Sequence, residues 1–124
     1  MNDLKLQQQS INCSIEIEID KAAQGFAALG SQARLQVMLT LVKAGEGGLM
    51  VGDIQTRTKM PASTLAHHLK FLKSAGLIMQ EKHGRAVINY AAYGHLEALA
   101  GYLLNECCVD EGGIQSFRKG SEDE

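Results

Sequence analysis

One stretch near the middle of the chain decides the fold, and it is Met60-Pro61-Ala62-Ser63-Thr64-Leu65-Ala66-His67-His68-Leu69-Lys70. Pro61 suits the first turn of a helix, because its φ is fixed and a missing N–H costs nothing there. Leu65, Leu69 and Leu72 then follow at the spacing 0, 4, 7, which places them on one apolar face. The pattern predicts a helix that begins at Pro61, ends at Ala75-Gly76 and packs against a core.

The opposite face of this helix carries the chemistry that nucleic-acid recognition requires. Ser63, His67 and Lys70 recur at the same spacing and lie about 200° around the helix from the leucines. A hydroxyl and an imidazole can donate or accept at base edges, and a lysine can contact guanine or phosphate. Thr64 and Lys73 flank these three side chains. This face is therefore a candidate reader of DNA bases.

The adjacent histidines raise a separate question. His68 falls nearer the leucine face, which favours a hydrogen-bonded orienting role over contact with bases. A zinc site at His67 and His68 is disfavoured, because neighbouring residues diverge on a helix and no further ligand follows four residues later on either face.

Positive charge is concentrated in the same part of the chain. Between Arg57 and Arg85, six basic residues oppose one carboxylate, Glu81, which gives this basic island a net charge of +5 in a chain whose total is −2. Phosphate attraction decays over about 8 Å at physiological salt, so the local charge counts for more than the total. A solvated helix face would be the interpretation if the charges stood alone. Beside the polar helix face, they favour nucleic-acid binding.

Two helices are expected before this stretch. The first begins at about Asp20 and stops at Gly30. Its apolar face comprises Ile19, Ala23, Phe26 and Ala27. The second runs from about Gln32 to Ala44 and is expected to be the core helix. Its apolar stripe comprises Leu35, Val37, Met38, Leu41 and Val42. A short edge strand at 49–51 and a short helix at 52–58 complete this half.

The period of the sequence changes after Gly76. Residues 77–81 and 86–90 are short β-branched or alternating runs, and the link Lys82-His83-Gly84-Arg85 predicts a hairpin with glycine at positive φ. A last helix is expected from His95 until Gly112-Gly113 stops it, with Leu96, Leu99 and Leu103 on its apolar face.

This order of elements predicts a mainly α protein with a β-hairpin wing, the winged helix-turn-helix. In that fold the second helix after a short turn enters the major groove, and Lys82 and Arg85 in the hairpin can reach the neighbouring backbone. We expect residues 1–14 to be a mobile N-terminal arm, 15–111 the DNA-binding and dimerisation domain, and 112–124 a flexible tail. The alternation Ile15-Glu16-Ile17-Glu18-Ile19 fits either a strand or the start of a helix.

Composition excludes several classes of protein. No apolar run approaches the roughly 18 residues of a membrane span, and no export signal begins the chain, so a cytoplasmic protein without membrane contact is expected. An odd number of cysteines, three, indicates reduced thiols rather than a disulfide framework. No Cys-x-x-Cys turn, cofactor motif or activating base is present, so we predict neither an enzyme nor an obligatory cofactor.

Several stretches together resemble one known family. Pro61 to Ile78 resembles the recognition helix and strand entry of the ArsR/SmtB repressors, Ala28 to Leu35 resembles their Leu-x-x-x-x-Arg-Leu motif, and Lys82 to Arg85 with Tyr90 resembles their wing. The resemblance covers about residues 20–108. It implies a homodimeric repressor on double-stranded operator DNA, with the first and last helices as the dimer interface and a ligand that releases the DNA.

Two sensing patterns of this family are absent. The short helix near 51–54 carries no cysteines, unlike the arsenic or cadmium site known there. The last helix lacks the zinc pattern Asp-x-His, because Tyr93 stands two residues before His95, and no histidine follows.

A third pattern matches. Asn105-Glu106-Cys107-Cys108 resembles the cysteine pair at the end of the last helix in one arsenic-responsive branch, which implies trivalent arsenic (arsenite or an organoarsenical) or antimony as the inducing ligand. That branch often has another cysteine downstream, but here none follows Cys108. Cys13, reaching across the dimer, is the candidate third ligand of such a thiophilic ion. The negative helix end should disfavour the thiolates of the pair.

Alternatives remain open at this point. The cysteines can be small packing residues at the dimer seam. The same fold also admits a thiol redox or persulfide sensor, in which Cys13 or the pair forms a disulfide. Two alternatives belong to other classes of protein. An enzyme that uses the adjacent thiols lacks supporting motifs. A winged helix that binds protein instead of DNA is disfavoured by the basic island.

Overall fold

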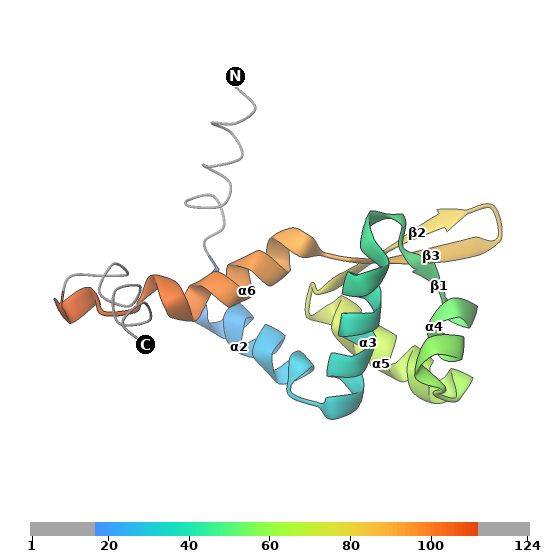
Figure 1. Ribbon diagram of the computed structural model, residues 1–124, viewed down its shortest axis with the longest axis horizontal. Coiled ribbons are helices and arrows are strands. Elements are labelled where there is room, and N and C mark those ends of the chain that lie inside the picture. Colours follow the sequence, from blue (N-terminus) through green and yellow to red (C-terminus); the bar gives the residue numbers. More distant parts are fainter. Residues whose placement is uncertain (1–16, 112–124) are drawn as a thin grey trace, which may run out of the picture.

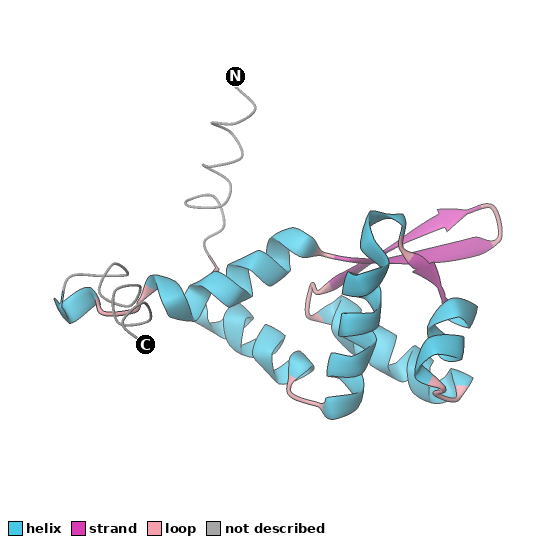
Figure 2. Cartoon of the chain, viewed as in Figure 1, coloured by secondary structure: helices cyan, strands magenta, loops and turns pink. Residues whose placement is uncertain are grey.

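The computed structural model describes residues 17–111 of the chain. Its helices are α2 (Ile19–Leu29), α3 (Gln32–Ala44), α4 (Val51–Thr58), α5 (Ala62–Ser74) and α6 (Tyr93–Asn105). Its strands are β1 (Leu49–Met50), β2 (Ile78–His83) and β3 (Ala86–Ala91), and short 3-10 turns lie at Gly45–Gly47 and Val109–Glu111. Mostly helical with a small β-hairpin, the chain has the predicted winged helix-turn-helix architecture (Figures 1 and 2). The predicted arm and tail lie outside the described residues.

The three strands form one antiparallel sheet in the order β1-β3-β2. The pair His83 and Ala86 closes the hairpin of β2 and β3. The turn is therefore only Gly84-Arg85, shorter than the predicted four-residue link, and Gly84 has the expected positive φ of 66°. In Figure 1 this wing lies at the right, at the opposite end of the molecule from the start of α2 and the end of α6.

The core lies between α3, α5 and the sheet. Leu65, Leu69 and Leu72 of α5 are all buried, which confirms the predicted apolar face. They share the core with Leu41 of α3 and Ile54 of α4. Full burial of such side chains stabilises the fold by roughly 1.5–3 kcal/mol each.

The predicted inner faces of α2 and α3 need correction. Ile19 is 73% exposed, and Ala23 and Phe26 are exposed too, whereas the buried positions of α2 are Ala22, Gly25 and Ala28. Along α3 the buried positions are Val37, Met38 and Leu41, while Leu35, Leu39 and Val42 face outward. Each helix has apolar residues on its buried face and also on a face that is exposed in the single chain. Periodicity alone therefore identified the wrong face of α2 and too wide an apolar face on α3.

The last helix also differs from the prediction. It begins at Tyr93 rather than His95 and ends at Asn105, well before Gly112. Leu99 is buried as expected, but Leu103 is 64% exposed and Leu104 is exposed as well. The cysteine pair thus follows α6 in a turn and does not lie within the helix. No helix between residues 17 and 111 is long and apolar enough to cross a membrane.

Candidate nucleic-acid interface and thiol site

The turn between α4 and α5 is fixed by local hydrogen bonds. Lys59 adopts a left-handed conformation, with φ 62° and ψ 27°, and its N–H donates to the carbonyl of Gln55 at 2.6 Å. Gln55 returns a hydrogen bond from Nε2 to the carbonyl of Met60 at 3.3 Å. Pro61 then precedes α5 in an extended conformation. These contacts set the angle at which α5 leaves α4.

All five predicted reading residues of α5 are exposed. They are Ser63, Thr64, His67, Lys70 and Lys73. Because the three leucines hold the opposite face in the core, the exposed face is presented by a rigid element. The structure brings the five side chains together on one helix, as the sequence predicted; contact with DNA remains a proposal.

The wing carries the two remaining predicted cations. Lys82 and Arg85 are exposed at the end of the hairpin. Sequence reasoning missed the network beside them, in which Oε1 of Glu81 accepts from the Tyr90 hydroxyl at 3.2 Å and lies 3.0 Å from Nε2 of His83. Desolvation and the neighbouring Glu81 raise the pKa of Tyr90. The single carboxylate of the basic island is thus bound within the wing.

His68 departs from its predicted role. Its Nδ1 is buried and has no hydrogen-bond partner among the described residues. Burial, followed by the positive charge of Arg34 and by His67, lowers the pKa of His68. Residues 17–111 hold no group of three or more His, Cys, Asp or Glu side chains that could bind a metal ion.

The cysteine pair occupies the turn after α6. Cys108 has a positive φ of 63°, and the Sγ atoms of Cys107 and Cys108 lie 2.8 Å apart. Both side chains are half-buried and free of disulfide. The hydrogen bond between the two sulfurs, burial, and the negative charges of Cys108 and Glu111 raise the pKa of Cys107 to about 11. Cys13 lies outside the described residues.

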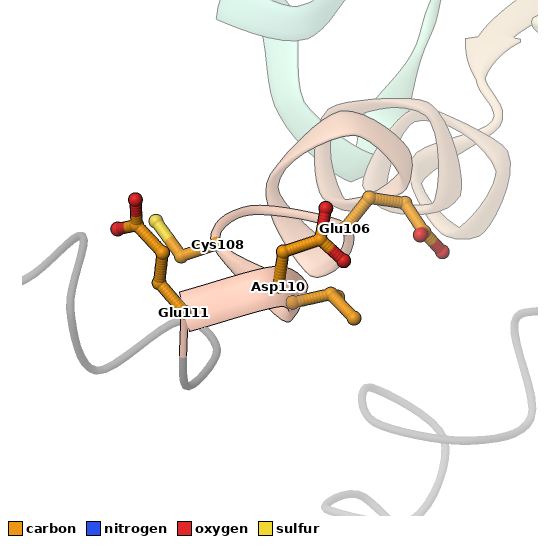
Figure 3. Close-up of a pocket in the computed structure, with 5 residues that line it drawn as sticks. Glu106, Cys108, Asp110 and Glu111 are labelled. Atoms are coloured by element: carbon orange, nitrogen blue, oxygen red, sulfur yellow. The ribbon is translucent and has the colours of Figure 1, made fainter.

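An open hollow of about 460 Å³ adjoins the pair, and Figure 3 shows four of its lining residues labelled. The lining residues are Glu106, Cys108, Val109, Asp110 and Glu111. Only one sulfur faces this hollow, among hard carboxylate oxygens that a soft ion disfavours. The pair of sulfurs, rather than the hollow, is therefore the candidate site for a thiophilic ligand.

Comparisons with known proteins identify the family of the chain. The sequence profile described as "Bacterial regulatory protein, arsR family" matches residues 31–79. The "Arsenical resistance operon repressor" of Bacillus subtilis is 33% identical over 104 residues, which cover 82% of this chain and 87% of that protein. The protein of the same name from Escherichia coli is 31% identical over 83 residues, covering 67% and 68% of the two chains.

Solved structures of transcriptional regulators have a similar fold. An ArsR-like transcriptional regulator from Rhodococcus has a TM-score of 0.61 at 27% identity, covering 68% of this chain and 76% of its own. A homodimeric winged helix-turn-helix DNA-binding domain from Mycobacterium bovis has a TM-score of 0.57 at 28% identity, covering 76% and 87%.

The fold and these similarities together define a winged helix-turn-helix protein that belongs to the transcriptional regulators. Within that class the chain belongs to the arsR family of bacterial regulatory proteins. This confirms the resemblance that the sequence motifs indicated, and the family and fold are those of regulators rather than enzymes.

Proposed function

We propose that the protein is a homodimeric transcriptional repressor that leaves its operator DNA when trivalent arsenic or antimony binds Cys107 and Cys108. The observation that carries this proposal is the pair of free thiols with sulfurs 2.8 Å apart, directly after α6. Similarity to two arsenical resistance operon repressors supports the choice of ligand.

Exposed apolar residues on α2 and α6 support the homodimer. These helices pack on each other, and each presents large side chains to solvent in the single chain. The exposed residues are Ile19 and Phe26 on α2 and Leu103 and Leu104 on α6. Covering them with the same surface of a second copy would remove this apolar area from water. We call these four residues the dimer face.

Double-stranded operator DNA is the proposed partner of α5 and the wing. Ser63 and His67 would contact base edges, and Thr64, Lys70 and Lys73 the bases or phosphates beside them. Lys82 and Arg85 of the wing would contact the neighbouring backbone. A regulator of this kind acts where the chromosome is, which in a bacterium is the cytoplasm.

A protonated Cys107 thiol suits a trivalent arsenical. Arsenous acid is neutral at pH 7, and each thiol that displaces one of its hydroxyls forms an S–As bond while its proton leaves with the hydroxyl as water. The high pKa of Cys107 is therefore no obstacle to this ligand. Cys13 is the proposed third ligand for inorganic arsenite, whereas two sulfurs suffice for an arsenical with one organic substituent.

The proposal is tested by titrating the reduced protein on a fluorescent promoter duplex with arsenite, phenylarsine oxide, peroxide or polysulfide. We expect release by the two arsenicals from the wild type and none from the Cys107→Ser, Cys108→Ser double variant. Release by peroxide or polysulfide alone would replace this proposal with the thiol redox or persulfide repressor of the same fold. No binding of the wild type to any duplex would overturn the proposed function.

A further inference from the structure

Arg34 lies where three helices meet. Its Nε donates to the carbonyl of Ala28 at 2.7 Å and its Nη2 to the carbonyl of Ala27 at 3.4 Å, both at the end of α2. Its backbone N–H donates to Oγ of Ser31, which caps α3, at 3.3 Å. The guanidinium carbon lies 4.0 Å from the ring centre of Phe71 on α5. One residue therefore joins the end of α2, the start of α3 and the outer side of α5.

Each of these contacts has a physical reason. The last carbonyls of a helix have no partner within the helix and form the negative end of its dipole, so a cation stabilises them. No basic residue lies in the last turn of α2 itself, so Arg34 supplies this charge from the next helix. Phe71 is 41% exposed, and its ring face is covered by the guanidinium rather than by the core. Only a planar guanidinium can donate in its plane and stack at the same time.

On its other side, α2 is packed tightly against α6. A Cβ at Gly25 would lie 2.5 Å from Cδ1 of Leu99, so any larger residue there would force the buried Leu99 side chain to move. The proposed dimer face lies on α2 and α6. The C-terminal end of α2 is bound by Arg34, which in turn stacks on Phe71 of α5. A rigid α2 therefore links the position of α5 to the position of the dimer face.

We propose that Arg34 is a positioning residue, which fixes the angle of the reading helix α5 relative to the dimer face and thereby the distance between the two reading helices of a dimer. This inference rests on the proposed homodimer on DNA. Dimeric helix-turn-helix proteins read two half-sites whose separation mirrors the spacing of their reading helices. A loosened Arg34–Phe71 contact should therefore weaken binding to a complete site far more than binding to one half-site.

The experiment uses the full-length protein and the duplex that the wild type selects from a random library. Affinity is measured for this duplex, for one with a scrambled half-site, and for one with a base pair inserted between half-sites. The variants are Arg34→Met, Arg34→Lys and Phe71→Leu. Lys43→Met is the matched control, because Lys43 is an exposed cation on the same helix α3.

We expect Arg34→Met to weaken binding to the complete site about tenfold, the equivalent of roughly 1.4 kcal/mol. Binding to the single half-site should change by less than about twofold, and the discrimination against the inserted base pair should shrink. Phe71→Leu should share this pattern, Arg34→Lys should show it in part, and the control should match the wild type.

Three results would overturn the inference. Equal decreases in affinity for complete and half-sites would indicate general destabilisation. A salt dependence reduced by about 0.9 in the log–log slope would make Arg34 a phosphate-binding residue. Unchanged affinity in Arg34→Met would show that other contacts set the angle. The last outcome leaves the proposed function standing, whereas a wild type that selects no duplex would overturn both.

Discussion

The sulfurs of Cys107 and Cys108 lie 2.8 Å apart, yet the contact between them raises the pKa of Cys107 to about 11. A protonated thiol such as Cys107 can replace a hydroxyl of arsenous acid without a net release of protons, because its proton leaves with the hydroxyl as water. A divalent ion must instead displace the protons, which makes its affinity depend on pH.

The reaction of arsenite with Cys107 should therefore release no proton, and arsenite affinity should depend only weakly on pH between about pH 6 and about pH 8. Cadmium affinity at the same thiols should rise with pH, by up to about tenfold per pH unit for each proton displaced. Equilibrium titrations in a non-coordinating buffer measure both slopes. A steep pH dependence for arsenite would show that the pair binds as thiolates.

Replacing Lys70 or Arg85 by alanine should weaken DNA binding and reduce its salt dependence. Removing one cation from a phosphate makes the slope of log K against log salt shallower by about 0.9 on duplex DNA. Fluorescence anisotropy at several salt concentrations gives the slope. Lys21→Ala is the control, since Lys21 is exposed on α2, outside the basic island. An unchanged slope would remove the residue in question from the DNA-binding surface.

Ser63→Ala and His67→Ala should act differently. If these side chains contact base edges, each substitution costs on the order of 1–3 kcal/mol and relaxes the preference at one position of the site. Selection from a random duplex library compares the preferred bases of variant and wild type. A uniform decrease in affinity across all sequences would instead assign the side chain to the DNA backbone.

The proposed dimer face can be tested by placing a charged residue in it. Phe26→Glu or Leu103→Glu should convert the dimer to monomer, because an unpaired carboxylate in an apolar interface costs several kcal/mol. The thermal unfolding of the monomer itself should change little, as both side chains are exposed in the single chain. Sedimentation velocity measures the oligomeric state, with Lys21→Glu on α2 as control. A variant that stays dimeric would move the interface elsewhere.

Periodicity predicted α5 well because its apolar and polar residues separate cleanly. Leu65, Leu69 and Leu72 pack inward, and Ser63, His67 and Lys70 are exposed, as the spacing required. The same reasoning failed on α2, where Ala22, Gly25 and Ala28 face the core of the chain and Ile19 and Phe26 do not. Sequence alone does not show which of two apolar faces a second copy would cover.

Contacts between residues far apart in the sequence could not be predicted from the sequence pattern either. Arg34 matched a family motif, but nothing in its spacing placed it over Phe71, because that contact depends on how α3 and α5 cross. The end of α6 at Asn105 was missed for a local reason. Glu106, Cys107 and Cys108 interrupt no helical pattern, yet they form a turn after Asn105 in which Cys108 takes a left-handed conformation.

The most direct test of the proposed sensing site is arsenite-induced release of operator DNA from single cysteine-to-serine variants. We expect Cys107→Ser and Cys108→Ser to bind the operator within about twofold of the wild type and to lose release, because the turn after α6 is distinct from α5 and the wing. Cys13→Ser should lose release by inorganic arsenite but keep release by phenylarsine oxide, which has only two bonds to offer sulfur. Full release from the double Cys107→Ser, Cys108→Ser variant would contradict the proposed sensing site and leave the pair as packing residues.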